Sequence, residues 1–244
     1  MTMRTASMVM ALLAALCAGP AWAEEDDDPW EGFNRAMFSV NDGLDRWVLE
    51  PVAKGWDFVM PDPLEQCFSN FFQNLRVPIQ GVNGFLQGKP VNGASDLGRF
   101  TVNTTIGLAG FLDPATYFGL VKHDEDFGQT LGVWGVPNGP YLVIPLLGPS
   151  TVRDAGGLAV DSMMQPGWYY LDVAVTVGWR VVDTINTRAI VLDDVQNARN
   201  AALDFYSFVR NGYLQRRHSL LLDEKDSTRE VDDSLYFPDD QPKR

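Results

Sequence analysis

The stretch FGQTLGVWGVPNGPYLVIPLLGPSTV, residues 127–152, lies between two parts of the sequence with helical patterning and decides which folds are open to the chain. It has no side chain that is charged at pH 7, a composition typical of a membrane-spanning helix. Its four prolines each lack an N–H donor, which excludes one continuous spanning helix. We predict a hairpin with arms at residues 131–136 and 141–147 around a turn at 137–140. A buried β-hairpin in a soluble core and a re-entrant membrane segment both remain open at this point.

Helical periodicity is strongest on the N-terminal side of this stretch. Apolar side chains from Leu64 to Leu75 recur at three- and four-residue spacing, which predicts an apolar stripe on a helix that begins near Pro63. The N-terminal half is therefore expected to be helical. Further helices are predicted at residues 30–47, at residues 78–88, and from an N-terminal cap at Ser95 and Asp96 through residue 106.

The C-terminal side is also expected to be helical. Val173, Val177, Val181 and Ile185 repeat at four-residue steps, as on one face of a helix. Because β-branched residues crowd residues 173–182, a strand remains an alternative there. Residues 186–222 contain no proline and no glycine before Gly212, which favours a helix. These patterns predict a mainly α, single-domain protein.

The composition and the two ends narrow the class of protein. The chain has 244 residues and a formal net charge of −13, which opposes nucleic-acid binding because that function needs a basic face. Residues 1–23 combine Arg4, an apolar run and Ala21-Trp22-Ala23, the features of a signal peptide cleaved after Ala23. Acylation of Cys17 is the alternative. We expect one helical domain over residues 24–222 and an acidic tail over residues 223–244.

Residues suited to catalysis or metal binding are sparse. His123 lies in Lys122-His123-Asp124-Glu125-Asp126, but consecutive side chains of a loop point in different directions. We therefore interpret this segment as a solvated acidic turn rather than a metal site. No serine has the G-x-S-x-G context of a nucleophile elbow. The sequence predicts no catalytic residue, no metal and no cofactor, and hence a protein that is not an enzyme.

A stripe of tyrosine and arginine is the remaining pattern. Tyr206, Arg210, Tyr213 and Arg217 fall on one face of a predicted helix. Arginines packed against tyrosines would stabilise a partly exposed surface. The alternative is an amphipathic wall that contacts lipid phosphates or a protein partner.

Several segments resemble, in the same order, those of the MlaA (VacJ) family of outer-membrane phospholipid-removal proteins. The opening Asp28-Pro29-Trp30-Glu31-Gly32-Phe33-Asn34-Arg35 is similar to the D-P-x-E-x-x-N-R motif of that family. The resemblance covers roughly residues 28–218. It continues through RFTVNTTIG at 99–107, GFLD at 110–113, FGQTLG at 127–132, GPY at 139–141, Pro145, Arg153-Asp154, Thr187-Arg188 and the Tyr206 to Arg217 stripe.

The resemblance implies a ring of helices embedded mainly in the periplasmic leaflet of the outer membrane of a Gram-negative bacterium. An amphipathic channel through the ring would let phospholipids leave the outer leaflet and so maintain lipid asymmetry. The implied partners are phospholipid, the outer-membrane bilayer, trimeric porins, a soluble periplasmic lipid carrier (MlaC-like) and an inner-membrane ABC complex. With the resemblance, the re-entrant placement of the hairpin is favoured over the soluble one.

The expected site has two parts. Membrane-embedded residues of the hairpin are Tyr141, Ile144 and Leu146. Residues expected to lie near the lipid channel are Phe33, Asn34, Phe38, Asn103, Phe111, Asp113, Arg210 and Tyr213. The alternative function is that of a soluble periplasmic binding or scaffolding protein without a channel, and a lipid hydrolase is third.

Overall fold

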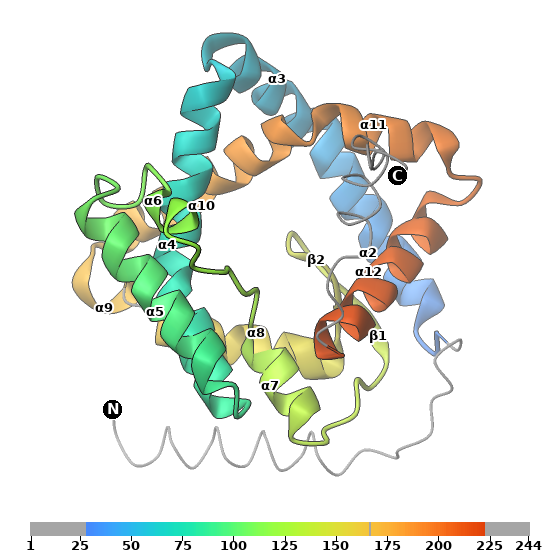
Figure 1. Ribbon diagram of the computed structural model, residues 1–244. Coiled ribbons are helices and arrows are strands. Elements are labelled where there is room, and N and C mark those ends of the chain that lie inside the picture. The colour runs from blue at the N-terminus through green and yellow to red at the C-terminus, as the bar shows by residue number, and fades with distance from the viewer. Residues whose placement is uncertain (1–27, 166, 223–244) are drawn as a thin grey trace, which may run out of the picture.

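The computed structural model describes residues 28–165 and 167–222, and it is mainly α-helical, as predicted. The helices follow one another around a central opening, and the first and last labelled helices, α2 and α12, meet on one side of it (Figure 1). The predicted signal peptide with its cleavage site, Cys17 and the acidic tail at residues 223–244 lie outside the described residues.

The N-terminal arc is a helical run with one wider turn. The predicted helix at residues 30–47 is confirmed, but it continues further than expected. The turn η1 has π-helical hydrogen bonding, which inserts an extra residue and changes the direction of the side chains that follow. The elements of this arc are α2 (Glu31–Leu44), η1 (Asp45–Leu49) and α3 (Glu50–Val59).

Helix α4 (Asp62–Leu86) is a single helix, whereas the sequence predicted two. Pro78 lies inside it. A proline removes one hydrogen bond to the carbonyl four residues earlier, and tertiary packing holds the rest of the helix together. Val77, next to the proline, and Phe72, earlier in the same helix, are both buried. The predicted break at Pro78 is therefore wrong.

Helix α5 (Pro90–Thr105) begins before the predicted cap. Gly88 has a φ of +76°, which ends α4, and the proline at residue 90 suits the first turn of the next helix. Asp96 therefore lies inside α5, where it is buried and accepts a hydrogen bond from the backbone N–H of His123 at 3.3 Å. The cap at Ser95 and Asp96 was a wrong prediction, because this carboxylate binds a distant loop instead of its own helix.

A hairpin exists in this stretch, but its position differs from the prediction: the turn lies at residues 145–147, inside the predicted second arm, and not at 137–140. Strands β1 (Tyr141–Ile144) and β2 (Gly148–Thr151) pair antiparallel, with Tyr141 opposite Thr151 and Ile144 opposite Gly148. The expected first arm, residues 131–136, instead forms the end of helix α7 (Phe127–Val133) and the turn after it. Asp126 caps that helix by accepting a hydrogen bond from Gln129 N–H at 2.8 Å.

The C-terminal part is helical, and the strand considered for residues 173–182 is absent there, since they belong to α10. Asp172 caps this helix through the N–H of Ala174, which overrides the β-branched composition. The helical run predicted over residues 186–222 is interrupted at Val191 and at residues 202–204. The elements are α8 (Val152–Met164), α9 (Gly167–Tyr170), α10 (Val173–Ile190), α11 (Leu192–Ala201) and α12 (Phe205–Leu221), with the short α6 (Pro114–Tyr117) earlier in the chain.

Side-chain contacts between distant segments close the ring. On one side, Arg35 of α2 pairs with Asp204 at the start of α12 at 2.7 Å. Arg199 of α11 pairs with Asp42 and Asp45 of the N-terminal arc at 2.8 and 2.6 Å. The remaining arcs meet through α4 with α7, α7 with α8 and α12, and α4 with α10 (Figure 1).

Candidate functional site

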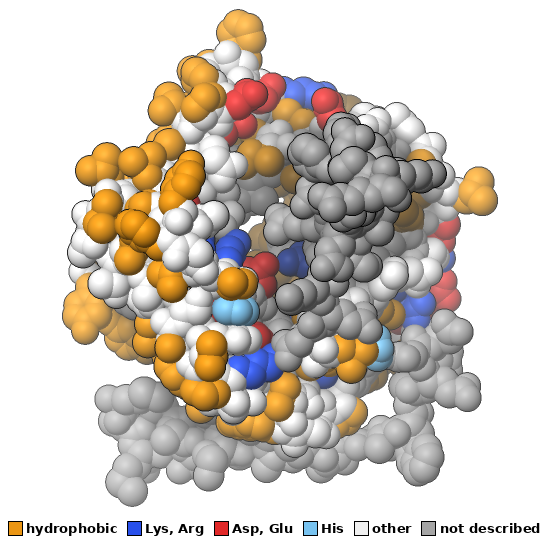
Figure 2. Space-filling view, in the orientation of Figure 1, with side chains coloured by type: hydrophobic (Ala, Val, Ile, Leu, Met, Phe, Trp, Pro, Cys, Tyr) orange, Lys and Arg blue, Asp and Glu red, His pale blue; other side chains and the backbone are white. Residues whose placement is uncertain are grey.

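The two sides of the ring differ in chemistry. Figure 2 shows a hollow inside the ring with charged side chains around it, and hydrophobic side chains gathered on the outer parts. Many large apolar side chains are exposed, among them Trp47 at 83%, Phe58 at 90% and Tyr170 at 85%. Among the described residues, no helix has the length and hydropathy needed to cross a membrane.

Two asparagines of α2 hold the hairpin by its backbone. The side chain of Asn34 donates to the carbonyl of Tyr141 at 2.9 Å and accepts from the N–H of Val143 at 2.9 Å. About two turns further along the same side of the helix, Asn41 donates to the carbonyl of Ile144 at 3.0 Å and accepts from the N–H of Leu146 at 2.8 Å. These amides replace a neighbouring strand for β1, whose outer edge is otherwise unpaired. Asn34, expected near the channel, thus acts as a buried clamp.

Sequence reasoning missed Asn41. The available signal was its spacing, because two asparagines seven residues apart face the same side of a helix. An amide can both donate and accept, which matches the alternating groups of a strand edge. The hairpin predicted from the prolines supplied such an edge.

Aromatic rings pack on the buried side of the hairpin. Tyr141 contacts Tyr206 and Tyr213 edge to face, with ring centroids 6.2 Å apart in both pairs. Phe38 packs on Tyr206 at 5.5 Å. Burial raises the pKa of Tyr141 to about 12, so its hydroxyl stays neutral at physiological pH. Arg210 lies over the Tyr141 ring at 5.9 Å. The structure therefore brings Phe38, Tyr213 and Arg210 together.

The tip of the hairpin faces away from this cluster. Leu146 has a φ of +66° and is 79% exposed, and Leu147 beside it is also exposed. Ile144, in contrast, is half-buried. Of the three residues expected to be embedded, only Leu146 has its side chain on the surface.

The tyrosine and arginine stripe on α12 is mainly a packing element. Tyr213 donates to Asp154 at 2.7 Å, and Arg217 pairs with Asp154 at 2.8 Å and with Asp126 at 2.5 Å. Burial opposes ionisation of Asp154, but Arg217 and Arg153 outweigh it and lower the pKa of its carboxyl. Arg210 differs, because no carboxylate of the described residues lies within ion-pairing distance of it. Its Nε is buried and lacks an acceptor among them.

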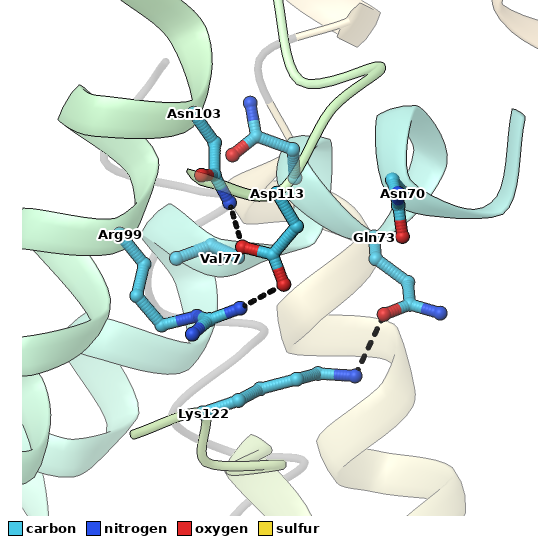
Figure 3. A pocket seen from close by; sticks show the side chains of 8 residues that line it. Asn70, Gln73, Val77, Arg99, Asn103, Asp113 and Lys122 are labelled. Carbon is cyan, nitrogen blue, oxygen red and sulfur yellow. Dashed lines mark hydrogen bonds and ion pairs between the residues drawn. The ribbon is translucent and has the colours of Figure 1, made fainter. Parts of the chain in front are cut away.

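A second group of expected residues lies on the opposite arc. Asn103 of α5 donates to Asp113 at 2.9 Å and accepts from the N–H of Ala115 at 3.0 Å. Arg99 donates to the same carboxylate at 2.7 Å (Figure 3). Phe111 stacks on Phe71 of α4, with centroids 4.7 Å apart. These residues line or adjoin a small polar cavity between α4 and α5.

Phe33 joins neither group. Its side chain is half exposed on α2, one position before the buried Asn34. A helix turns by about 100° per residue, so neighbouring positions face different sides. The eight expected channel residues therefore fall into the hairpin group, the Asn103 group and this single exposed position.

The loop at residues 122–126 is not the solvated acidic turn that we expected. His123 lies 3.2 Å from Asp96, measured from Nδ1 to Oδ1, and Asp96 is almost fully buried. Glu125 is also buried and pairs with Lys89 at 3.1 Å. The loop crosses the pair of helices α4 and α5, and this contact buries Glu125 and partly buries His123, whereas Lys122 and Asp124 stay exposed as expected. No group of three metal-ligating side chains occurs within residues 28–165 and 167–222.

Comparisons with known proteins agree on one family. Residues 26–220 match the family model described as MlaA lipoprotein. The intermembrane phospholipid transport system lipoprotein MlaA of Haemophilus influenzae is 36% identical over 180 residues, which is 69% of this chain and 72% of that protein. The protein of the same name from Escherichia coli K12 is 40% identical over 163 residues, 62% of this chain and 64% of that protein.

A solved structure has the same architecture. It was reported as the structural basis for maintenance of bacterial outer membrane lipid asymmetry. Its TM-score is 0.71 at 40% sequence identity, and the match covers 80% of this chain and 99% of that chain. The ring of helices is thus a shared fold.

Proposed function

This chain belongs to the MlaA lipoprotein family, and from that premise we propose that it removes phospholipid from the outer leaflet of a Gram-negative outer membrane. Removal of misplaced phospholipid maintains the lipid asymmetry of that membrane. The protein is a component of intermembrane phospholipid transport, and its task is passage of a lipid, with no bond made or broken.

The observation that carries this proposal is the contrast between the two sides of the ring. Hydrophobic side chains gather on the outer parts, which suits contact with lipid, and the exposed large apolar side chains include Trp47, Phe58 and Tyr170. Exposed tryptophan and tyrosine are typical of membrane interfaces. Charged groups surround the hollow inside (Figure 2). A phospholipid needs both environments, because its head group is charged and its chains are apolar.

Residues of the hairpin group supply the proposed membrane contact and part of the lipid path. The exposed tip at Leu146 enters the periplasmic leaflet, while Asn34 and Asn41 satisfy the backbone behind it. Arg210 is the proposed contact for a lipid phosphate, because the described residues give its charge no carboxylate partner. Phe38 and Tyr213 form the adjoining wall.

The proposed partners follow from the place of such a protein between two membranes. Trimeric porins would hold the ring in the outer membrane, and a soluble periplasmic carrier would take the lipid onward. The alternative function, a soluble periplasmic scaffold, predicts that the protein leaves the membrane pellet without detergent. Fractionation of native envelopes separates the two.

Deletion of the gene tests the function directly. We expect phospholipid to accumulate in the outer leaflet and cells to become sensitive to detergent with EDTA. Labelling of outer-leaflet phospholipid before and after complementation measures this. Labelling equal to that of the parent strain would contradict the proposed transport role.

Leu146→Asp tests the membrane contact of the hairpin tip. The exposed side chain permits the change without loss of core packing, whereas Ile144→Asp would also disturb the fold. A charge within a bilayer costs on the order of 2.5–3.5 kcal/mol on insertion scales. We expect a smaller carbonate-resistant membrane fraction at unchanged expression. Leu203→Asp, at an exposed site between α11 and α12, is the matched control. Equal membrane retention of both variants would refute insertion of the tip.

Arg210→Ala tests the proposed phosphate contact. The protein should stay in the membrane while detergent resistance of the cells falls. Arg216→Ala, an exposed neighbour on the same helix, is the control and should behave like the parent. If the two variants clear lipid equally well, Arg210 only packs on Tyr141.

A further inference from the structure

A polar cavity on the α4–α5 arc has groups that the described residues leave unpaired. Its volume is about 20 Å³, and its lining is Asn70, Gln73, Asn74, Val77, Arg99, Asn103, Asp113 and Lys122. Lys122 comes from the segment joining α6 to α7, which runs between α5 and the central opening in Figure 1. Figure 3 shows its side chain crossing beneath the cavity toward Gln73. The cavity therefore adjoins the inner side of the ring.

The lining of this cavity carries two cations, Arg99 and Lys122, and one carboxylate, Asp113, while Lys122 is also paired with a carboxylate outside the lining. Both oxygens of Asp113 are occupied: one accepts from Asn103 and Thr116 N–H, the other from Arg99 and the Thr116 hydroxyl. Arg99 thus neutralises Asp113. The ammonium of Lys122 donates to Gln73 at 2.7 Å and lies 3.6 Å from Asp124, whose side chain is half exposed. Lys122 remains accessible enough to contact an anion at the mouth.

Two buried polar atoms of the lining residues lack a partner within residues 28–165 and 167–222. Asn74 is 3% exposed and its Nδ2 donates to Thr104, but its Oδ1 accepts nothing. Arg99 is 4% exposed and its Nε donates to nothing. An unpaired buried donor or acceptor is costly, so the cavity favours an occupant that both donates and accepts. A hydroxyl group does both, a primary ammonium only donates, and a trimethylammonium does neither.

We propose that this cavity is a head-group site for glycerophospholipids, with the phosphate at Lys122 and a terminal hydroxyl of the head group inside. This rests on the proposed transport function and assigns it a lipid preference. The volume suits a group of about the size of one water molecule. Head groups that end in glycerol are preferred, those that end in ethanolamine are second, and choline is excluded by its size and its lack of a donor.

The test is competitive lipid binding by the full chain in uncharged detergent, read by native mass spectrometry. The probes are short-chain phosphatidylglycerol, phosphatidylethanolamine and phosphatidylcholine, with glycerol 3-phosphate as an arm without acyl chains. We expect the glycerol lipid to bind about tenfold more tightly than the choline lipid, the effect of one unpaired buried group. Glycerol 3-phosphate should not compete at equal concentration.

Variants of the lining residues distinguish lipid binding at the cavity from lipid binding elsewhere on the protein. Lys122→Gln should weaken binding of the glycerol lipid about fivefold, and Lys122→Arg should restore it. Lys54→Gln, an exposed lysine of α3, is the control. Asn74→Asp keeps the acceptor and adds a negative charge, so it should shift the preference toward ethanolamine. If Asn74 had only a structural role, Asn74→Asp would not change which of the three lipids binds most tightly.

The proposal would be overturned by equal binding of glycerol and choline lipids by the parent, or by unchanged binding by Lys122→Gln. Equal competition by glycerol 3-phosphate would assign the cavity to free phosphate esters and also refute it. The transport function is judged separately by outer-leaflet labelling in the deletion strain. If the parent clears lipid normally but binds the three head groups equally, the head-group site is rejected and the proposed transport function is not.

Discussion

The two ends of helix α12 are fastened by ion pairs of similar length but different burial. At the start, Arg35 pairs with Asp204 at 2.7 Å, and both side chains are 43% exposed. Near the end, Arg217 pairs with Asp154 at 2.8 Å, and these side chains are 10% and 7% exposed. Water screens the first pair, whereas the second has lost its hydration and depends on its partners. The distances alone therefore do not tell which of the two ion pairs contributes more to stability.

The buried end is also more connected. Arg217 reaches Asp126, the cap of α7, and Asp154, in the first turn of α8, so one guanidinium joins three helices. Burial works against its charge, but these two carboxylates raise the pKa of Arg217 above its usual value. The exposed end joins only α2 to α12, and Arg35 also lies over the Tyr206 ring at 4.4 Å. The buried end should therefore control stability.

The largest effect is expected for Arg217→Met. The change leaves Asp154 buried with Arg153 as its only cationic partner within 4 Å among the described residues. Loss of one partner of a buried pair costs about 3–5 kcal/mol, and Arg153 keeps the loss near the lower value. The measurement is thermal unfolding in detergent, followed by circular dichroism. Arg216→Met on the exposed side of the helix should change little. Similar unfolding of both variants would mean that the junction is not buried as described.

Gly157→Ala tests the helix crossing on which this buried end rests. A Cβ at Gly157 would lie 2.3 Å from the backbone nitrogen of Gly128, so α7 and α8 would have to move apart. Overpacking of this kind costs typically about 1–3 kcal/mol. Gly178→Ala in α10 meets nothing within 4 Å and should stabilise its helix slightly. An unchanged unfolding temperature for Gly157→Ala would show that α7 and α8 are packed less tightly at this crossing than the 2.3 Å separation indicates.

A pH series sharpens the comparison further. In the parent, the pKa of Asp154 is lowered, so its contribution is present above the ordinary carboxyl pKa near 3.8 and lost only as pH falls below it. Loss of Arg217 removes the strongest attraction that lowers this pKa, so we expect the pKa of Asp154 to rise and the variant to be penalised more at high pH than at low pH. The stability gap between parent and Arg217→Met should therefore narrow from pH 7.5 to pH 4.5. A gap that widens on acidification would contradict the assigned role of Asp154.

The smallest effect is expected at the exposed end. Arg35→Gln removes the pair with Asp204 and the contact with Tyr206, but it leaves no buried charge behind. We expect the unfolding temperature to fall by less than about 2 °C, and the fall to shrink further in 0.5 M salt. A loss as large as that of Arg217→Met would overturn the ranking by burial.

The helices were predictable where one face is apolar, as in α4 and α10, because that periodicity is local. Pro78 and Asp96 show the limit of local patterns. The conformation at each residue depends on contacts with segments far along the chain, which the local sequence does not reveal. The presence of a hairpin in residues 127–152 was predictable from the prolines, but its arms, its turn and its register were not. That register depends on the side chains of Asn34 and Asn41, about 100 residues earlier.

The site was less predictable than the fold. The motif residues Asn34, Asn103 and Asp113 were expected near the channel, and the structure assigns each of them hydrogen bonds within the protein. Phe38, Tyr213 and Arg210 come together around Tyr141 only through the ring closure. The Lys122 cavity was missed, since its lining comes from two helices and two loops with no common motif.

Closure of the ring between α2 and α12 also constrains how the chain is made. The polypeptide grows from its N-terminus, so α2 emerges long before Asp204 and Tyr206 exist to meet it. Until then the chain is an open arc, and the face of Phe38 that packs on Tyr206 is uncovered. Contacts between sequence-distant segments form slowly and leave apolar surfaces exposed meanwhile. We therefore expect ring closure to be a late step of folding, and the arc to be most open to wrong contacts before its final helix docks.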